Sequence, residues 1–419
     1  MTKGTRLQAF LGLLLLLTAC DAAAASPGPT CASSSPHPGY LVQLCLTAPL
    51  AGSILSGNRP ITASVLTSGS APLVNGVTFT LDGTYLTFDG QAPYTFTLHT
   101  HLYTPGPHTL AAAVAFANGD VSTAVSIPTY VAASSPPPAP PPFQPTPGRE
   151  AAPGQPFVVA ATGDGASGLA AEQQVADLIA GWQPNLFLYL GDVYRHGSAE
   201  DYLNWYGDGQ SLYSRFRTIT DPTVGNHEFE LDRRGRAYFD YWGGAPSYYS
   251  VDTHGWHVVV LDNASPGVDL RAGSPQYRWL SAELTAHPNP CTIITYHRPR
   301  FNLDEEGPAP DFDAFWRLIA DHHVPLVING HAHNYQRWKP LNADGQVADG
   351  GTTQFVAGTG GQWISTLESN DPRLAIGFDS TATAWGALRL TLSAVGAHYA
   401  FVSRAGVTED EGFVPCAPA

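Results

Sequence analysis

Positive charge is scarce in this chain. Lysine occurs only at Lys3 and Lys339, and 20 lysines and arginines stand against 35 aspartates and glutamates, which gives a formal net charge of -15. Nucleic-acid backbones are bound by basic surfaces, so this balance argues against nucleic acid as a partner. It does not exclude a phosphorylated small substrate, because a bound metal ion supplies local positive charge.

Long apolar runs are also rare, and the one at the N-terminus is short. The run from about residue 7 to residue 17 falls short of the ~20 residues that a membrane-spanning helix needs, and it fits the core of a signal peptide. Residues 17–20, Leu-Thr-Ala-Cys, resemble a bacterial lipobox, which would make residues 1–20 a lipoprotein-type signal peptide and Cys20 its lipid-modified residue. The alternative is ordinary secretion after the small residues 22–25. Both predict export, either as a cell-envelope lipoprotein held to the membrane by its lipid alone or as a secreted protein.

Cysteine is sparse, with five residues in the chain. With Cys20 set aside, Cys31, Cys45, Cys291 and Cys416 remain, and an exported chain meets an oxidising environment. Their wide spacing does not resemble a zinc-ribbon pattern, and an even count suits two disulfides, although four cysteines allow three pairings. We favour Cys31–Cys45, which are close in sequence, and then Cys291–Cys416 by elimination.

Two segments of different character follow, separated by a proline-rich stretch. Residues 31–132 contain short runs that alternate apolar and polar residues between turn signals, which predicts a small all-β immunoglobulin-like sandwich that serves as a spacer or adheres to carbohydrate or a surface. His99 and His101 have no acidic or cysteine partner nearby in sequence and are interpreted as an ordinary surface pair. Residues 133–156 are dense in proline and predict a semi-rigid linker.

The remaining sequence has the pattern of an α/β domain. Between residues 157 and 405, apolar strands without alternation are interleaved with helices, and residues 406–419 are expected to form a C-terminal tail. The expected helices cover 170–182, 276–287 and 311–323. The expected strands, counted with their exit residues, include one that begins at 157 and others over 185–192, 256–262, 291–297, 324–330 and 352–358, with a closing hairpin over 387–403.

Polar residues of metal-binding type follow five of these apolar segments. They are Asp164, Asp192, the segment Gly225-Asn226-His227-Glu228, His297, and His331 with His333. One aspartate after a strand is often only a helix cap, but five such exits in series predict one site, because ligands gather where the carboxyl ends of strands open into a crevice. Carboxylate and imidazole ligands suit iron, zinc or manganese. The other histidines near strand or helix ends are interpreted as structural; they are His254, His257, His322 and His323.

The ordered motifs GDG, GDVY, GNHE, HRPRF and GHAHNYQR resemble those of the calcineurin-like metallophosphoesterases, and within them the purple acid phosphatase-like branch. The resemblance covers roughly residues 157–403. It implies a metallophosphoesterase βαββ sandwich, in which two mixed sheets flanked by helices hold two metal ions at their common edge.

The resemblance also implies a role for each matching residue. Asp164 and His333 would bind the first metal, Asp192 would bridge both, and Asn226, His297 and His331 would bind the second. Two cations held ~3.5–4 Å apart share a hydroxide that becomes a nucleophile near neutral pH. His227 would stabilise the transition state or protonate the leaving group, and Glu228 would orient its imidazole.

Three departures from the family pattern concern the first metal and its surroundings. The family's tyrosine ligand comes three residues after the bridging aspartate, where this chain has Arg195. Tyr194 stands one residue early, and because a one-residue shift at a strand exit can turn a side chain to the opposite side, we expect that it is not a ligand. Ala166 replaces the histidine of other branches, and Gln336 stands in place of a glutamate. Water, Tyr194 or His196 would therefore complete the first metal's shell.

The signal-like N-terminus and the resemblance together predict an exported binuclear-metal hydrolase of phosphoesters, in the first place of phosphomonoesters. A phosphodiesterase acting on nucleotides or phospholipid head groups is a second hypothesis, since specificity would lie in the loops 195–217 and 302–310. A surface binding protein with a structural metal site is a third, but it predicts loss of His227, which is present. Arg298 would contact phosphate or pair with an acidic neighbour, Asp304 or Glu305.

Overall fold

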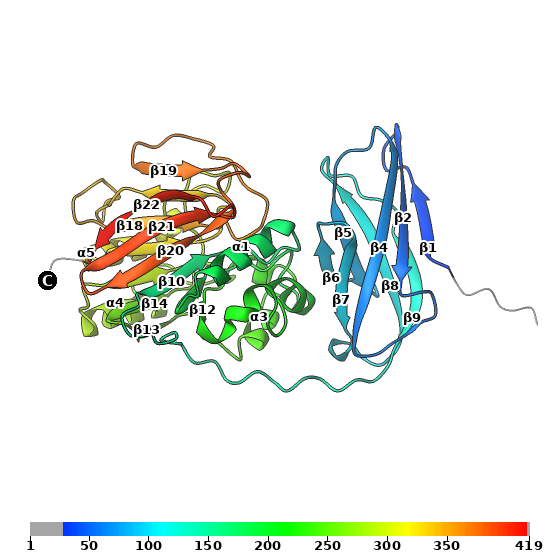
Figure 1. Ribbon diagram of the computed structural model, residues 1–419, viewed down its shortest axis with the longest axis horizontal. Coiled ribbons are helices and arrows are strands. Elements are labelled where there is room, and N and C mark those ends of the chain that lie inside the picture. The colour runs from blue at the N-terminus through cyan, green and yellow to red at the C-terminus, as the bar shows by residue number, and fades with distance from the viewer. Residues whose placement is uncertain (1–27, 417–419) are drawn as a thin grey trace, which may run out of the picture.

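The computed structural model describes residues 28–416, which form two domains joined by an extended strap (Figure 1). The expectations for the signal peptide and Cys20 lie outside the described residues. Within residues 28–416, no helix has both the length and the apolar composition that crossing a membrane requires.

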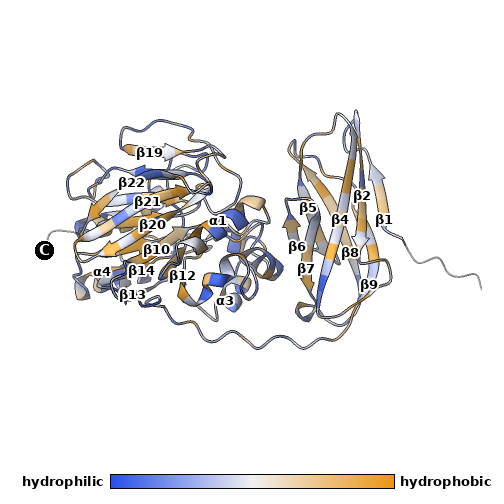
Figure 2. Cartoon of the chain, viewed as in Figure 1, coloured by the Kyte–Doolittle hydropathy of each residue, from blue (hydrophilic) through white to orange (hydrophobic). Residues whose placement is uncertain are grey.

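The N-terminal domain is a sandwich of two β-sheets, as the alternating sequence predicts. One sheet has the order β1-β2-β4-β7 and the other β3-β9-β8-β5-β6. Alternate residues face the core, as in β9, where every second residue is buried, and hydrophobic residues run along the strands in Figure 2. The strands are β1 (Thr30–Ser34), β2 (Tyr40–Ala48), β3 (Ile54–Leu55), β4 (Asn58–Gly69), β5 (Val74–Leu81), β6 (Thr84–Asp89), β7 (Tyr94–His99), β8 (Gly106–Phe116) and β9 (Val125–Val131), with a 3-10 turn η1 (Thr100–Leu102) after β7. Cys31 and Cys45 stand opposite each other on β1 and β2 and form a disulfide.

The proline-rich linker runs along the C-terminal domain and is hydrogen-bonded to it. The Phe143 amide donates to the Gly243 carbonyl at 2.9 Å, and the Arg149 amide donates to the Asn185 carbonyl at 2.7 Å. The Thr146 amide donates to a carboxylate oxygen of Asp221 at 2.9 Å. The linker is therefore a strap fixed to the domain surface.

The C-terminal domain contains two mixed sheets packed face to face. The six-stranded sheet has the order β12-β11-β10-β20-β21-β22, and the seven-stranded sheet has the order β13-β14-β15-β16-β18-β17-β19. The first consists of β10 (Phe157–Thr162), β11 (Leu186–Tyr189), β12 (Thr220–Pro222), β20 (Gly386–Ser393), β21 (Gly396–Ser403) and β22 (Thr408–Pro415). The second consists of β13 (Tyr249–Thr253), β14 (Trp256–Val260), β15 (Thr292–Thr295), β16 (Leu326–Asn329), β17 (Tyr335–Trp338), β18 (Thr353–Ala357) and β19 (Leu374–Phe378). The central parallel strands are buried throughout, which explains their non-alternating sequences.

Helices cover the outer faces of these sheets. They are α1 (Ala170–Gly181), α2 (Ala199–Asp201), α3 (Arg236–Tyr241), α4 (Pro275–Ala286) and α5 (Asp313–Asp321), with the short turns η2 (Tyr202–Tyr206), η3 (Leu212–Ile219), η4 (His227–Phe229) and η5 (Pro310–Phe312). The start of α4 is set by the Ser274 side chain, which accepts from the Tyr277 amide, and by Pro275 in the first turn. A disulfide between Cys291 and Cys416 joins the segment before β15 to the end of β22.

Two expectations about the periphery were wrong. Residues 408–415, expected in a tail, form β22, whose Asp410 accepts hydrogen bonds from Tyr335 and Arg337 of the other sheet. His99 is not on the surface: it is 4% exposed, and its Nδ1 lies 2.7 Å from a carboxylate oxygen of Glu200 in the C-terminal domain. Its acidic partner lies 101 residues away, beyond any local pattern.

Candidate metal centre

All five predicted strand exits converge on one edge of the two sheets. Asp164 follows β10 and Asp192 follows β11, both from the six-stranded sheet, whereas His297 follows β15 and His331 follows β16 of the other sheet. The His331 amide donates to Asp164 at 2.8 Å, and His297 Nε2 lies 3.2 Å from an oxygen of Asp192, so the two sheets meet at these side chains.

The ligand atoms predicted for the second metal gather around His297. The ligand atoms of Asp192, His297 and His331 all lie within 4.8 Å of one another. His297 Nε2 is also 3.1 Å from the amide oxygen of Asn226, and its Nδ1 donates to the Leu190 carbonyl at 2.8 Å. This second hydrogen bond fixes the ring and leaves Nε2 free to bind a metal, as is usual for histidine ligands.

The ligand atoms predicted for the first metal surround the hydroxyl of Tyr194, which the sequence analysis expected not to be a ligand. The hydroxyl lies 2.8 Å from Asp164, 3.0 Å from Asp192 and 2.7 Å from His333 Nε2. His333 Nδ1 donates to the Trp363 carbonyl at 2.9 Å, so this ring is oriented in the same way as His297. Asp192 contributes to both groups, which is the position that a bridging carboxylate requires.

Glycines beside the ligands let the loops approach closely. A Cβ atom at Gly225 would lie 2.1 Å from Asp192 Oδ1, and one at Gly330 would lie 2.6 Å from Asp164 Oδ2. Three of the ligand residues themselves have positive φ angles, 57° at Asp164, 63° at Asp192 and 69° at His331. Non-glycine residues in this conformation are uncommon and concentrate at functional sites, because only surrounding interactions hold them there.

The site is a buried cluster of opposite charges. Burial opposes ionisation of Asp192, but the His297 and His227 imidazoles hold its pKa well below the ordinary value. For His297 burial favours the neutral ring, yet Asp192 raises its pKa to about 9. Burial and the adjacent carboxylates of Asp164 and Asp192 raise the pKa of Tyr194 well above its usual range. Such a donor set of carboxylates, a phenol and several imidazoles fits a pair of cations better than protons.

His227 lies at the mouth of this cluster. Its side chain is 22% exposed, and its Nε2 is 3.8 Å from an oxygen of Asp192. Its Nδ1 lies 2.6 Å from the Arg195 carbonyl and 3.1 Å from a carboxylate oxygen of Glu230. The Arg195 carbonyl therefore orients this ring through a hydrogen bond, and Glu230, which sequence reasoning did not single out, lies beside the same nitrogen three residues further along the chain.

The prediction that Glu228 orients His227 was wrong. Glu228 is 2% exposed, and its carboxylate accepts hydrogen bonds from the amides of Val193 at 2.8 Å and Gly225 at 2.8 Å and from the Tyr202 hydroxyl at 3.0 Å. The η4 turn directs it away from the cluster and into the loops that carry the ligands. Glu228 thus ties the exit of β11 to the GNHE loop.

The remaining predicted pocket residues lie at the periphery. His196 Nδ1 is 2.5 Å from Glu230, and its ring packs against Tyr85 of the N-terminal domain. Arg298 is not paired with Asp304 or Glu305, as one alternative proposed; its nearest carboxylate is that of Asp311, at 3.9 Å.

Comparisons with known proteins agree with this geometry. A family profile for calcineurin-like phosphoesterases matches residues 157–335, and one for bacterial Ig domains matches residues 43–112. The phosphoenolpyruvate phosphatase of Allium cepa is 32% identical over 136 residues, covering 27% of this chain and 27% of the relative. Purple acid phosphatase 22 of Arabidopsis thaliana is 27% identical over 180 residues, covering 34% of this chain and 41% of the relative. The chain thus matches well under half of the length of these relatives.

Among solved structures, the purple acid phosphatase PPD1 from yellow lupin seeds superposes with a TM-score of 0.53, at 16% identity, over 92% of this chain and 73% of that one. This likeness concerns the fold. Residues 157–335 of this chain match the calcineurin-like phosphoesterase family, and the chain is similar to purple acid phosphatases in part of its sequence and in its fold.

Proposed function

We propose that this protein is an exported hydrolase that cleaves phosphoesters, most of all phosphomonoesters, with two metal ions. The observation that carries the proposal is the position of Asp192. One of its oxygens lies 3.0 Å from the Tyr194 hydroxyl and 3.2 Å from His297 Nε2, so that a single carboxylate serves two groups of ligand atoms.

We assign the first metal to Asp164, Tyr194 and His333 and the second to Asn226, His297 and His331, with Asp192 shared. Tyr194 enters this assignment because its hydroxyl lies among the other three side chains, although it stands one residue before the family's tyrosine. Iron, manganese and zinc all suit these nitrogen and oxygen ligands. When bound, such a pair of ions supplies an activated water at neutral pH and neutralises charge on phosphoryl oxygens.

The chain's own residues then position the ester and move a proton. His227 has its Nδ1 occupied by the Arg195 carbonyl and Glu230, so its Nε2 faces the ligand cluster. From there the imidazole would hydrogen-bond a phosphoryl oxygen and protonate the departing alkoxide. Glu228 contributes indirectly, since its hydrogen bonds to the amides of Val193 and Gly225 hold the two ligand loops together.

A hydrolysis panel tests this function. Purified protein loaded with iron, manganese or zinc is assayed on phosphomonoesters, on nucleotide diesters and on phospholipid head-group diesters. The names of the curated relatives support monoesters, and we expect kcat/KM to be highest for them. Faster turnover of diesters would favour the phosphodiesterase alternative. No turnover of any phosphoester with any of these metals would leave the surface binding protein, with a structural metal site, as the better account.

Export and the role of the sandwich domain are part of the same proposal. The two disulfides are expected of a chain that folds in an oxidising compartment. The buried contact between His99 and Glu200 fixes the sandwich against the loop that follows Tyr194. The sandwich is therefore a rigid neighbour of the metal centre, and lipidation at Cys20 would hold both domains at the cell envelope.

A further inference from the structure

We propose a second, separate metal site, formed by His257, Glu283 and His287, that binds one zinc-like divalent cation at the opposite end of the seven-stranded sheet. Nothing in the sequence drew attention to it, since His257 was interpreted as structural and the three residues span 31 positions. It does not depend on the proposed phosphoesterase function.

The chain topology brings the three residues together. His257 stands at the start of β14 and pairs with Thr292 at the start of the parallel strand β15. The connection between the two strands is α4, which carries Glu283 and ends just before His287. Because a parallel crossover must return to the end where the first strand began, the last turn of α4 lies beside His257. The phosphoesterase ligands follow the carboxyl ends of β15 and β16, so the two sites lie at opposite ends of these strands.

The distances suit a tetrahedral ion. Glu283 Oε1 lies 3.5 Å from His257 Nε2 and 3.2 Å from His287 Nδ1. The ligand atoms of all three residues lie within 4.8 Å of one another. Atoms held about 2.0–2.1 Å from a tetrahedral zinc ion lie roughly 3.3–3.4 Å apart, which is close to the separation between Glu283 and His257.

The second ring nitrogen of His257 is buried and points into the cluster. Its side chain is 1% exposed, and Nδ1 lies 2.8 Å from a carboxylate oxygen of Asp252, to which it donates. Its Nε2 is buried and has no hydrogen-bond partner among residues 28–416. A buried imidazole nitrogen without a partner is costly, whereas carboxylate–histidine–metal triads are the usual surroundings of a histidine ligand.

Neighbouring groups hold the other two ligands in reach of an ion. The Ser250 hydroxyl donates to Glu283 Oε1 at 2.6 Å and orients that carboxylate. The His287 ring lies nearly parallel to that of His257, at 14°, and its Nδ1 lies 3.2 Å from the Glu283 carbonyl oxygen. The ring must turn and give up this contact to direct a nitrogen at a shared ion. Its side chain is 44% exposed, so this rotation is open. A shallow surface pocket lined in part by Asp252 and His287 lies beside the cluster.

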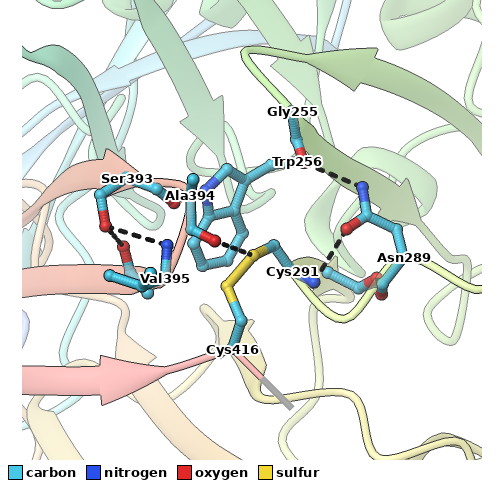
Figure 3. The surroundings of a disulfide bond; sticks show 10 residues. Gly255, Trp256, Asn289, Cys291, Ser393, Ala394, Val395 and Cys416 are labelled. Atoms are coloured by element: carbon cyan, nitrogen blue, oxygen red, sulfur yellow. Dashed lines mark hydrogen bonds between the residues drawn. A yellow bond between two sulfur atoms is a disulfide. The ribbon is translucent and has the colours of Figure 1, made fainter. Parts of the chain in front are cut away.

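The backbone around the site is fixed by the C-terminal disulfide and its surroundings (Figure 3). The Asn289 side chain donates to the Gly255 carbonyl at 2.9 Å and accepts from the Cys291 amide at 2.9 Å. The His257 amide donates to the Cys291 carbonyl at 3.0 Å, and Cys291 is bonded to Cys416. The segment that follows α4 is thereby held against the start of β14, so an ion would meet a preformed frame.

Zinc stoichiometry tests this site directly. The full chain and its variants are equilibrated with Zn²⁺, freed of loose ion by gel filtration, and analysed for metal per chain. His287→Ala is suitable because that side chain is partly exposed, and Glu283→Gln keeps the shape of the side chain. His322→Ala is the matched control, since His322 is an exposed residue that caps α5 as His287 caps α4.

We expect His287→Ala and Glu283→Gln each to hold one zinc fewer than the unmodified chain, with phosphoester hydrolysis unchanged, and His322→Ala to match the unmodified chain. The difference of one ion is expected whether or not the phosphoesterase centre takes up zinc. Added Zn²⁺ should also raise Tm less in His287→Ala than in the control. Equal zinc content in all four proteins would overturn the proposal.

Discussion

Asp221 carries a buried carboxyl group whose ionisation should make the C-terminal domain less stable as the pH rises. The residue lies on β12 and is 0% exposed; one oxygen accepts from the Thr146 amide of the strap, and the other has no hydrogen-bond partner among the described residues. Burial raises its pKa to about 7, and the hydrogen bond from Thr146 opposes this only in part. In the unfolded chain the pKa returns to about 3.9.

The sign and size of the effect follow from these two pKa values. Between about pH 4 and pH 7 the folded domain keeps a proton on Asp221 that the unfolded chain releases, so the free energy of unfolding falls as the pH rises through this window. A shift of roughly three pKa units lowers the free energy of unfolding by about 4 kcal/mol at pH 8, relative to a pH below both pKa values. At pH 5 the same effect lowers it by only about 1.5 kcal/mol. Asp221→Asn has no such proton to lose. Relative to the unmodified chain it should therefore gain about 2.5 kcal/mol between pH 5 and pH 8.

Urea unfolding at both pH values, with both proteins carrying the same metal, measures this change. Any effect of the asparagine that does not depend on pH cancels in the comparison. Asp321→Asn, at an exposed position on α5, is the control and should follow the unmodified chain. If Asp221→Asn and the unmodified chain lose the same stability between pH 5 and pH 8, Asp221 is ionised in the folded domain and the reasoning fails.

The other predictions concern the metal centre and the second disulfide. Tyr194→Phe removes a hydroxyl within 3.0 Å of three side chains, so elemental analysis should find one metal bound at least about tenfold more weakly, and an iron-loaded protein should lose any visible tyrosinate band. Unchanged affinity and colour would exclude Tyr194 as a ligand. His227→Ala should lower kcat by about 10²- to 10⁴-fold at full metal content, and parallel loss of metal would instead make His227 a ligand. Cys416→Ser opens a loop of 125 residues and should lower the free energy of unfolding by about 3–5 kcal/mol; a change below about 1 kcal/mol would mean that the disulfide adds little.

The order and type of the secondary structure elements could be predicted because their sequences carry local signals. The strand from Phe157 and the helix from Ala170 lie within one or two residues of their expected positions. The convergence of the proposed metal ligands could be predicted for the same reason, since they follow apolar segments and the carboxyl ends of such strands meet at one edge. Their assignment to individual metals came from the family resemblance.

Tyr194 and Glu228 show where local reasoning stopped. The argument against Tyr194 assumed the alternation of an extended strand, but β11 ends at Tyr189, and Asp192 has a φ of 63°. In such a turn, side chains no longer alternate between two faces as they do along a strand, so the position in sequence does not decide where a side chain points. Glu228 follows His227 directly, and both belong to one 3-10 turn, in which the two side chains point to different neighbours.

Contacts between residues far apart in the sequence could not be predicted. Glu200, which binds His99, belongs to another domain, and Asp410, which binds Tyr335 and Arg337, belongs to a strand whose sequence TEDEGFVP alternates weakly. Such contacts depend on how separate elements pack, and a single sequence holds no periodic signal for them.

The central claim is that Asp192 bridges two catalytic metal ions, and Asp192→Asn tests it most directly. Metal content and phosphomonoester hydrolysis are measured on the same preparations of variant and unmodified chain. The account predicts two metals per chain at the phosphoesterase centre of the unmodified protein, and loss of metal with nearly all turnover in the variant. A variant that retains both metals and its activity would contradict it.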